Sequence, residues 1–298
     1  MSPSFSIITA CKGRLDHLKR SLPRMLAQKD AEVIVVDYSC PEGTADFVER
    51  EFPQAKVIRV KGEKGFSNWR SRNLGAAAAS GTMLIFCDAD TILADGAVEK
   101  LAKSMPAKSF GFFTRHATEK FNRSGSRLAK NQMRGFHVIP AAAFKTLDGY
   151  DEVAGGYAAG GDTDLEERLM RRGFKNYQLG DGVVEDVIEH APETRFTYHD
   201  DPIVLSYAAG LLYRRAKMAL MNVTRKPNLP LKTRQDLYRA ARLAAANLTK
   251  GKNAASMNVT FEKRVIGMPR QLGFEEGHHS ASIVVRIDMR KKIDRPPE

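Results

Sequence analysis

The feature that most constrains this chain is a short apolar run that ends in two carboxylates. Residues 83–87 read Met-Leu-Ile-Phe-Cys, and Asp88 and Asp90 follow with one alanine between them. An apolar run of this length predicts a strand buried in a parallel sheet. Ligand sites of open α/β sheets lie just beyond the carboxyl ends of such strands. Two carboxylates placed there repel each other unless a divalent cation, which can also carry phosphate oxygens, holds them.

Strand-like and helix-like segments alternate on both sides of this run. Apolar spacing of three and four predicts a helix over 15–26. Thr44 is a natural cap for a second helix that ends at residue 52, and a third helix, which contains Trp69 and a face of small residues, is closed by Gly81. The alternation predicts an α/β fold with a doubly wound, mostly parallel sheet. The expected strands are residues 4–10, 31–36, 55–60, 83–87, 110–114, 135–140 and 183–188.

Three later segments differ from this alternation. Residues 115–134 are polar and poorly periodic, which predicts a long loop; such loops are usually either functional lids or disordered segments. A glycine-rich stretch over 149–161 leads into a helix for which Asp162 is a natural N-cap. From Ile203 onward we expect mostly helix, with two helices divided by prolines at 227 and 230 and a strand-like end over 282–287.

The charge is distributed unevenly along the chain. Residues 1–209 hold 28 Lys and Arg against 28 Asp and Glu, whereas residues 210–298 hold 19 against 7, so the whole net charge of +12 lies in the last third. We therefore expect a catalytic domain over 1–200 and a basic, mainly helical extension over 201–298. A basic segment favours an anionic partner, such as a membrane surface or a charged polymer.

Composition also bears on the compartment. No apolar run is long enough to cross a bilayer, and the first residues lead directly into a strand. The three cysteines show no metal-ligand spacing and their odd number suits a reducing compartment. These features predict a cytoplasmic protein, with peripheral contact at the inner face of the membrane through the basic extension.

Carboxylates and a histidine gather where strands end. Asp37 ends the second strand, and an ionised carboxylate there would accept hydrogen bonds from a nucleotide base or ribose. Asp90 with His190, which follows a later strand, could hold the metal. Asp162 could act as a general base toward an incoming hydroxyl.

In order and spacing, these motifs resemble those of GT-A-fold glycosyltransferases of family 2. The matching segments include Val33–Asp37, Arg72–Ala76, Phe86–Asp90 and Asp162–Leu165. A narrower similarity to β-1,4-galactosyltransferases and chondroitin-polymerase-like enzymes is carried by Gly13–Lys19, Gly160–Leu165 and Val187–His190.

The resemblance implies an inverting, metal-dependent hexosyltransferase. Such an enzyme would move a hexose or N-acetylhexosamine from a nucleotide sugar, UDP-linked by this resemblance, to a glycan or lipid-linked acceptor in polysaccharide biosynthesis. It also implies a role for each matching position. The pocket for the nucleotide base would be lined by Thr9, Cys11, Arg14 and Asp37, and the ribose or diphosphate would be contacted by Arg72 and Asn73. Asp88 would face the ribose and sugar, Asp90 and His190 would bind Mn²⁺ or Mg²⁺, and Asp162 would be the general base of the reaction.

The sequence departs from this pattern at three places. Relatives have Glu-Asp where this chain has Gly161 and Asp162, so the base is either Asp162 or Asp164. The tryptophans that stack on the acceptor sugar are replaced by residues 156–159, which indicates a different acceptor. Val187 stands where a methionine can join the metal.

Two other functions compete with this one. A sugar nucleotidyltransferase needs a glycine-rich phosphate loop after its first strand, and residues 11–14, Cys-Lys-Gly-Arg, are a poor one. A non-catalytic protein that binds nucleic acid or another anionic polymer could use the basic extension. That extension has few of the interleaved aromatic residues typical of nucleic-acid binding, so no nucleic acid is expected as a partner. Lys12, Lys61 and Lys64 are expected to be surface charges.

Overall fold

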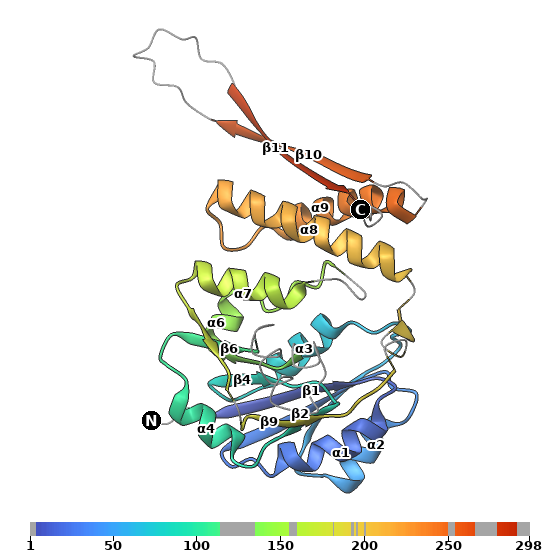
Figure 1. Ribbon diagram of the computed structural model, residues 1–298, viewed down its shortest axis with the longest axis vertical. Coiled ribbons are helices and arrows are strands. Elements are labelled where there is room, and N and C mark those ends of the chain that lie inside the picture. Colours follow the sequence, from blue (N-terminus) through green and yellow to red (C-terminus); the bar gives the residue numbers. More distant parts are fainter. Residues whose placement is uncertain are drawn as a thin grey trace, which may run out of the picture. The chain divides into compact units, whose positions relative to one another are not determined.

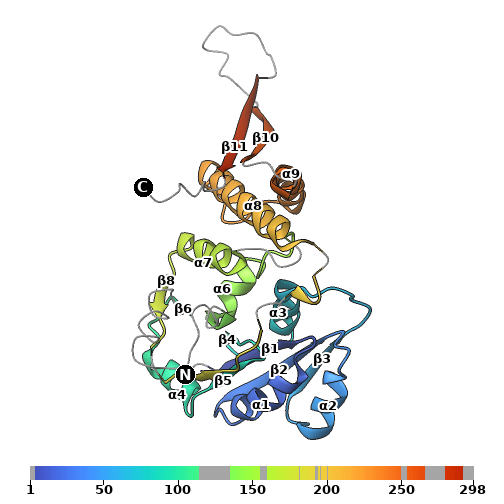
Figure 2. The same ribbon diagram turned by 45° about the vertical axis from the view of Figure 1, so that its right-hand side comes forward.

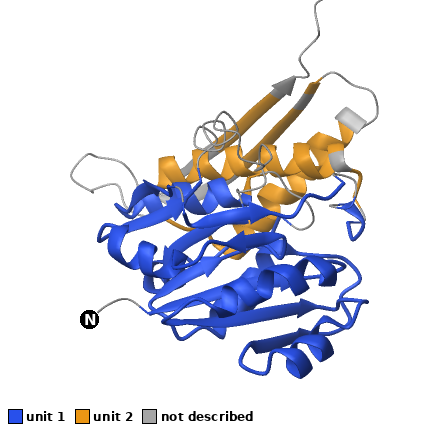
Figure 3. Cartoon of the chain, turned by 60° about the horizontal axis from the view of Figure 1, so that its bottom comes forward, with its two compact units in different colours: residues 1–156, 161–200 blue, residues 157–160, 201–298 orange. Residues whose placement is uncertain are grey.

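A computed structural model of the chain forms two compact units (Figure 3). Unit 1 comprises residues 1–156 and 161–200, and unit 2 comprises residues 157–160 and 201–298. The residues that the structure describes are 4–113, 135–154, 160–180, 182–191, 194, 196–199, 201–249, 254–265 and 279–290. The loop predicted over 115–134 lies outside them.

Unit 1 is built on a seven-stranded sheet in the order β3-β2-β1-β4-β7-β6-β8 (Figure 1). Strands β3, β2, β1 and β4 are parallel to one another, whereas β7 is antiparallel to both β4 and β6. The predicted α/β fold with a mostly parallel sheet is thereby confirmed. The strand bounds are β1 (Phe5–Cys11), β2 (Ala31–Tyr38), β3 (Lys56–Val60), β4 (Met83–Phe86), β6 (Ser109–Phe112), β7 (His137–Pro140) and β8 (Lys175–Gln178).

Helices cover both faces of this sheet (Figures 1 and 2). One face packs against α1 (Leu15–Leu26), α2 (Thr44–Glu51) and α4 (Ala97–Ser104). The other packs against α3 (Asn68–Ala77), α6 (Ala141–Thr146) and α7 (Gly161–Arg171). This arrangement explains why the central strands read as continuous apolar runs, since both faces of each strand are buried.

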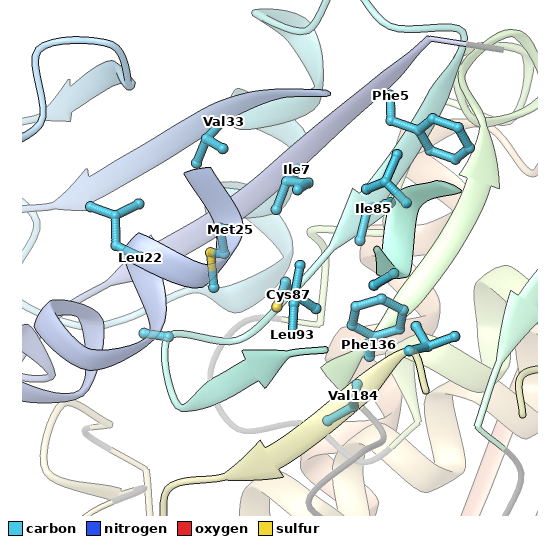
Figure 4. Packing of buried hydrophobic residues seen from close by; sticks show 14 of the residues in the cluster. Phe5, Ile7, Leu22, Met25, Val33, Ile85, Cys87, Leu93, Phe136 and Val184 are labelled. Atoms are coloured by element: carbon cyan, nitrogen blue, oxygen red, sulfur yellow. The ribbon is translucent and has the colours of Figure 1, made fainter. Parts of the chain in front are cut away.

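The core on the α1 face shows how the apolar spacing of a helix is used (Figure 4). Leu18, Leu22 and Met25 project from one side of α1 and are fully buried. They belong to the same cluster as Ile7 of β1 and Ile85 of β4. Their spacing of three and four places all three on the stripe that faces the sheet.

The register of the sheet brings the ends of its strands to one edge. Cys11, the last residue of β1, lies beside Asp37 of β2, and Ile8 lies beside Phe86, the last residue of β4. The loops that follow β1, β2 and β4 therefore leave the sheet at the same edge. This is the edge at which the aspartates of the sequence motifs lie.

Some elements of unit 1 were not predicted. Strands β5 (Thr91–Leu93) and β9 (Val184–Val187) form a separate antiparallel pair. Of these two strands, only β9 falls in a predicted strand. The edge strand β8 reads Lys-Asn-Tyr-Gln and α6 is only six residues long. Neither has an apolar pattern long enough to be recognised, because an edge strand and a short helix bury few side chains.

Unit 2 contains two helices and a hairpin. The helices α8 (Ile203–Thr224) and α9 (Leu231–Thr249) lie on either side of the two prolines, as the sequence predicts. Strands β10 (Ala254–Val265) and β11 (His279–Arg290) pair antiparallel, and only β11 was predicted, over part of its length. Among the described helices, none combines the length and apolar character that crossing a membrane requires.

The approach of α3 to β1 gives a stability prediction. A Cβ on Gly75 would lie 2.3 Å from Ile8 Cγ2, and Ile8 is a buried, stiff β-branched residue. We expect Gly75→Ala to lower the free energy of unfolding by about 1–3 kcal/mol through overpacking. Urea unfolding measures this loss. The control is Gly180→Ala, because a Cβ at Gly180 would meet nothing within 4 Å; equal effects of the two substitutions would contradict the packing.

Candidate active site

A buried arginine joins two of the predicted site aspartates. Arg72 of α3 is 3% exposed. Its Nη2 donates to Asp88 Oδ1 at 2.8 Å and to the Gly135 carbonyl oxygen at 2.7 Å. Its Nη1 lies 3.4 Å from Asp162 Oδ1. One guanidinium therefore brings together a carboxylate that follows β4 and a carboxylate at the start of α7.

The carboxylates around Arg72 stabilise its positive charge. Burial by itself lowers the pKa of Arg72, but attraction from Tyr150, Asp88 and Asp162 raises that pKa above its ordinary value. Arg72 therefore stays charged, and its charge offsets the repulsion between Asp88 and Asp162. Gly135 makes room for this arrangement, because a Cβ there would lie 1.7 Å from Asp88 Oδ2.

Two further side chains complete the group around Arg72, and neither was predicted from the sequence. The Tyr150 hydroxyl lies 3.2 Å from Arg72 Nη1, and burial is the main cause that raises the pKa of Tyr150. His137 of β7 is fully buried, with Nδ1 at 2.5 Å from the Tyr150 hydroxyl and Nε2 at 3.3 Å from Asp162 Oδ1. His137 lies in a predicted strand, where the pattern predicts only core, and Tyr150 lies in the glycine-rich stretch over 149–161, where no pattern marks a buried residue.

Asp90 has a different partner, His190. His190 Nε2 lies 3.2 Å from Asp90 Oδ2, and the His190 side chain is 6% exposed. The two residues that the sequence assigns to the metal are therefore in contact. Arg14 joins them, because its Nη2 lies 3.3 Å from His190 Nδ1 and donates to Thr194 Oγ1 at 2.6 Å.

The Asp90–His190 pair suits a divalent metal chemically. A carboxylate oxygen and an imidazole nitrogen are ligands that Mn²⁺ accepts. His190 Nδ1 lies between the Ala191 carbonyl oxygen at 3.2 Å and Arg14 Nη2 at 3.3 Å. Metal binding through Nε2 would need the tautomer in which Nδ1 donates to that carbonyl oxygen and not the one in which Nδ1 accepts from Arg14. Within the described ranges, no group of three or more His, Cys, Asp or Glu side chains is arranged to hold a metal.

Asp37 is engaged by the backbone of the loop that follows it. Its Oδ1 accepts from Cys40 N at 2.7 Å and its Oδ2 accepts from Ala45 N at 2.8 Å. The carboxylate thereby fixes the turn into α2. Its contact with a nucleotide base stays a prediction, as does that of Thr9, which is 1% exposed in β1.

Cys11 and Cys40 form a coupled thiol pair beside this loop. Hydrogen bonding with Cys40 and burial raise the pKa of Cys11. The hydrogen bond from Cys11, with smaller contributions from Thr44 and the backbone N–H of Gly13, lowers the pKa of Cys40 to about 5. Cys40 is therefore the thiolate of the pair at neutral pH.

Asn73 and Asp164 make hydrogen bonds that hold neighbouring parts of unit 1 together. Asn73 pairs with the backbone of Tyr150, donating to its carbonyl oxygen at 2.9 Å and accepting from its N–H at 2.9 Å. Asp164 is 4% exposed and accepts from Arg168 Nε at 2.8 Å. Arg168 in turn donates to the carbonyl oxygens of Leu147 and Gly149. Of the two candidate bases, only Asp162 contacts the group around Arg72.

The expectation that Lys12 is a surface charge is wrong. Lys12 is 6% exposed, and its Nζ donates to the carbonyl oxygens of Tyr38, Ser39 and Glu63 at 3.1, 3.0 and 2.7 Å. The ammonium group therefore ties the β1 loop to the loops after β2 and β3. Sequence reasoning missed this role because it depends on carbonyl groups that come together only in the fold.

Family comparison agrees with this arrangement. The family model described as glycosyl transferase family 2 matches residues 6–157, just over half of the 298 residues. The chain belongs to this family. It is a glycosyltransferase, as the resemblance of its motifs predicts. The narrower similarity to galactosyltransferases and chondroitin polymerases stays a prediction, and no curated protein matches the chain significantly.

Solved structures show the same GT-A fold at low sequence identity. A mannosyltransferase, PcManGT from Pyrobaculum calidifontis, solved with GDP-Man and Mn²⁺, is 16% identical with a TM-score of 0.50, over 84% of this chain and 76% of its own. Residues 1–349 of S. aureus TarS, solved with UDP-GlcNAc, are 14% identical with a TM-score of 0.53, over 81% of this chain and 72% of their own. In another TarS structure, at 15% identity and a TM-score of 0.51, the match covers 81% of this chain but 43% of that chain.

The thiol pair gives a reactivity prediction. Because the pKa of Cys40 is lowered to about 5, Cys40 is a thiolate well below neutral pH, whereas the pKa values of Cys11 and Cys87 are raised. We expect limited iodoacetamide at about pH 6.5 to alkylate Cys40 first. Peptide mass spectrometry measures the order of labelling. In Cys11→Ala, the loss of the hydrogen bond should slow labelling of Cys40, and an unchanged rate would contradict the coupling.

Proposed function

We propose that this glycosyltransferase is an inverting, metal-dependent enzyme that uses a nucleotide-sugar donor, UDP-linked, and extends a glycan or a lipid-linked acceptor by a hexose or N-acetylhexosamine. The observation that carries the proposal is that Asp162 and Asp88 share the buried guanidinium of Arg72. Asp90, two residues beyond Asp88, pairs with His190. A base and a metal pair are thereby held at one edge of a family 2 domain.

Asp162 is the base in this proposal. Its side chain is 29% exposed, whereas that of Asp164 is 6% exposed and bound by Arg168. A general base must reach the hydroxyl whose proton it takes, and the more exposed Asp162 is the better placed of the two carboxylates to do so. Removal of that proton lets the acceptor oxygen attack the anomeric carbon from the face opposite the leaving diphosphate, so the configuration inverts.

Asp90 and His190 would hold Mn²⁺ or Mg²⁺, which when bound would neutralise charge on the leaving diphosphate. Asp88 would contact the ribose and the sugar while Arg72 fixes its orientation. The guanidinium of Arg72 is already bound to Asp88 and Asp162 in the interior, so we do not assign it a direct contact with the donor diphosphate. Arg14, beside His190 and only partly buried, is the cation better placed for that contact.

The rival nucleotidyltransferase function is weakened by Lys12. Such an enzyme would use a basic residue of the β1 loop to bind phosphates. Lys12 instead donates to three carbonyl oxygens and is buried, so its ammonium group is occupied by the protein itself.

A donor screen tests the proposed reaction. We expect Mn²⁺-dependent hydrolysis or transfer with a UDP-sugar, and we expect Asp162→Asn to lower kcat by about 10²- to 10⁴-fold while donor binding persists. Asp90→Asn should abolish the Mn²⁺-dependent part of binding, measured by calorimetry. GDP-linked and CMP-linked sugars serve as competing donors.

The control for this screen is Asp46→Asn, which changes an exposed carboxylate of α2 that pairs with Arg59. It should leave turnover and binding unchanged. Failure of every nucleotide sugar to bind, or equal Mn²⁺-dependent binding by Asp90→Asn and the wild-type chain, would contradict the proposal.

Unit 2 is proposed to dock the enzyme on an anionic membrane surface, where lipid-linked acceptors lie. It carries the basic part of the chain and exposes apolar side chains that soluble helices usually bury. Val204 and Tyr207 of α8 are 55% and 53% exposed, and Leu243 of α9 is 71% exposed. Basic residues and exposed apolar residues together favour the interface of an anionic bilayer.

Liposome flotation tests this contact. We expect the chain to float with anionic vesicles at low salt and to be released as salt rises, because attraction to the surface is screened. Charge reversal at two exposed positions of unit 2, Arg215→Glu with Lys226→Glu, should abolish flotation. The matched control is Lys61→Glu with Lys64→Glu in unit 1, which changes the net charge equally; loss of binding in both, or in neither, would contradict docking through unit 2.

A further inference from the structure

We propose that His137 is a positioning residue for the reaction, which donates from Nε2 to the Asp162 carboxylate, and that Tyr150 holds His137 in the tautomer that allows this. The inference rests on the proposed function, in which Asp162 is the general base. Neither His137 nor Tyr150 needs to touch the substrate for this role.

The position of His137 is fixed by packing. The residue is fully buried in β7, and its ring lies 4.1 Å from that of Phe112 on the neighbouring strand β6, between ring centroids. Tyr150 is 2% exposed, and its ring stacks on that of Trp69 at 5.1 Å. Neither side chain can therefore turn away from Asp162 without disturbing the core.

The neighbours of His137 determine which ring nitrogen carries the hydrogen. Nδ1 lies 3.2 Å from Arg72 Nη1 and 2.5 Å from the Tyr150 hydroxyl. A guanidinium can only donate, so the favourable arrangement has Nδ1 as an acceptor. The tyrosine hydroxyl accepts from Arg72 at 3.2 Å and is the nearer neighbour of Nδ1, so it can give its own hydrogen to the single lone pair of Nδ1. The remaining hydrogen of a neutral imidazole must lie on Nε2.

Tyr150 keeps the hydrogen that this arrangement needs. Burial, as the largest cause, raises the pKa of Tyr150 above its ordinary value, although Arg72 acts in the opposite direction. The phenol therefore remains protonated and can donate. In this way the hydroxyl selects the tautomer of His137, as a second residue commonly does for a functional histidine.

The consequence is an Asp162 carboxylate held from two sides. His137 Nε2 lies 3.3 Å and Arg72 Nη1 lies 3.4 Å from the same oxygen, Asp162 Oδ1. The Arg72 contact is a long hydrogen bond, whereas Nε2 of His137 lies within ion-pair distance of Oδ1 but without hydrogen-bond geometry in this structure. The proposed donation therefore requires a small approach of the two groups, and contacts of catalytic groups often tighten in this way when substrate binds. Because both donors address Oδ1, they set the plane of the carboxylate and thus the direction in which Oδ2 points. The orientation of a base strongly affects its rate.

Substitutions that keep one nitrogen at a time test the role. Glutamine at 137 can place an amide N–H near the position of Nε2, whereas asparagine reaches only as far as Nδ1. We expect His137→Asn to lower kcat about 10- to 100-fold with the donor KM within about twofold. His137→Gln should retain most of the activity. Tyr150→Phe should lower kcat less than His137→Asn does, because it disturbs only the tautomer.

A second readout does not depend on activity. Long-range ¹H–¹⁵N correlation spectra distinguish the two neutral tautomers of histidine and the imidazolium, and His137→Gln assigns the signal. We expect His137 in the wild-type chain to show the Nε2–H tautomer, and in Tyr150→Phe to show a mixture of tautomers. An Nδ1–H tautomer or an imidazolium in the wild-type chain would overturn the inference.

The outcomes separate this inference from the function on which it rests. If the wild-type chain turns over a nucleotide sugar and Asp162→Asn does not, the proposed function holds, whatever His137 does. Equal kcat values for His137→Asn and His137→Gln, in variants with equal thermal midpoints, would then overturn the positioning role alone. Absence of turnover in the wild-type chain with every donor would instead overturn the proposed function. The tautomer of His137 observed by NMR would still decide whether Tyr150 holds His137 with its hydrogen on Nε2.

Discussion

The ion pairs of Arg72 are the interaction on which the site depends. A buried guanidinium is costly unless carboxylates and carbonyl oxygens satisfy it, and here Asp88, Asp162 and the Gly135 carbonyl do so. The carboxylates of Asp88 and Asp162 are 39% and 29% exposed, so solvent weakens these pairs in part, whereas the Arg72 charge itself is buried and would be left uncompensated if both partners were removed. The same contacts therefore stabilise unit 1 and fix two carboxylates that would otherwise repel each other.

Packing places Arg72 where these contacts can form. Helix α3 approaches β1 closely because Gly75 presents no side chain to Ile8, and Gly135 leaves room for the Asp88 carboxylate. Asp88 thereby pairs with Arg72 inside the site, while Asp90 pairs with His190. Two residues of one short motif thus have different partners and, in the proposed function, different roles.

Much of this could be predicted from the sequence, for a physical reason. Buried strands such as 83–86 are apolar on both faces, and helices such as 15–26 repeat every three to four residues, so the order of strands and helices is visible in the pattern of apolar residues. The edge of the sheet at which Asp88 and Asp90 lie follows from strand order alone. The predicted metal pair is in contact, although its function stays a prediction.

Long-range partners could not be predicted. Nothing local shows that Asp162 contacts Arg72, or that Lys12 is enclosed by backbone carbonyl groups. The Asp164–Arg168 pair is different, because its members are four residues apart on α7, a spacing at which helix side chains meet. His137 has apolar neighbours typical of a core strand and Tyr150 has polar neighbours typical of a loop, so no local pattern marks either as part of a site.

The most direct test of the account is a crystal structure with Mn²⁺ and a hydrolysis-resistant UDP-sugar. The account predicts Mn²⁺ bonded to Asp90 and the sugar beside Asp88 and Asp162. Nucleotide bound elsewhere, with Asp90 unligated, would contradict it.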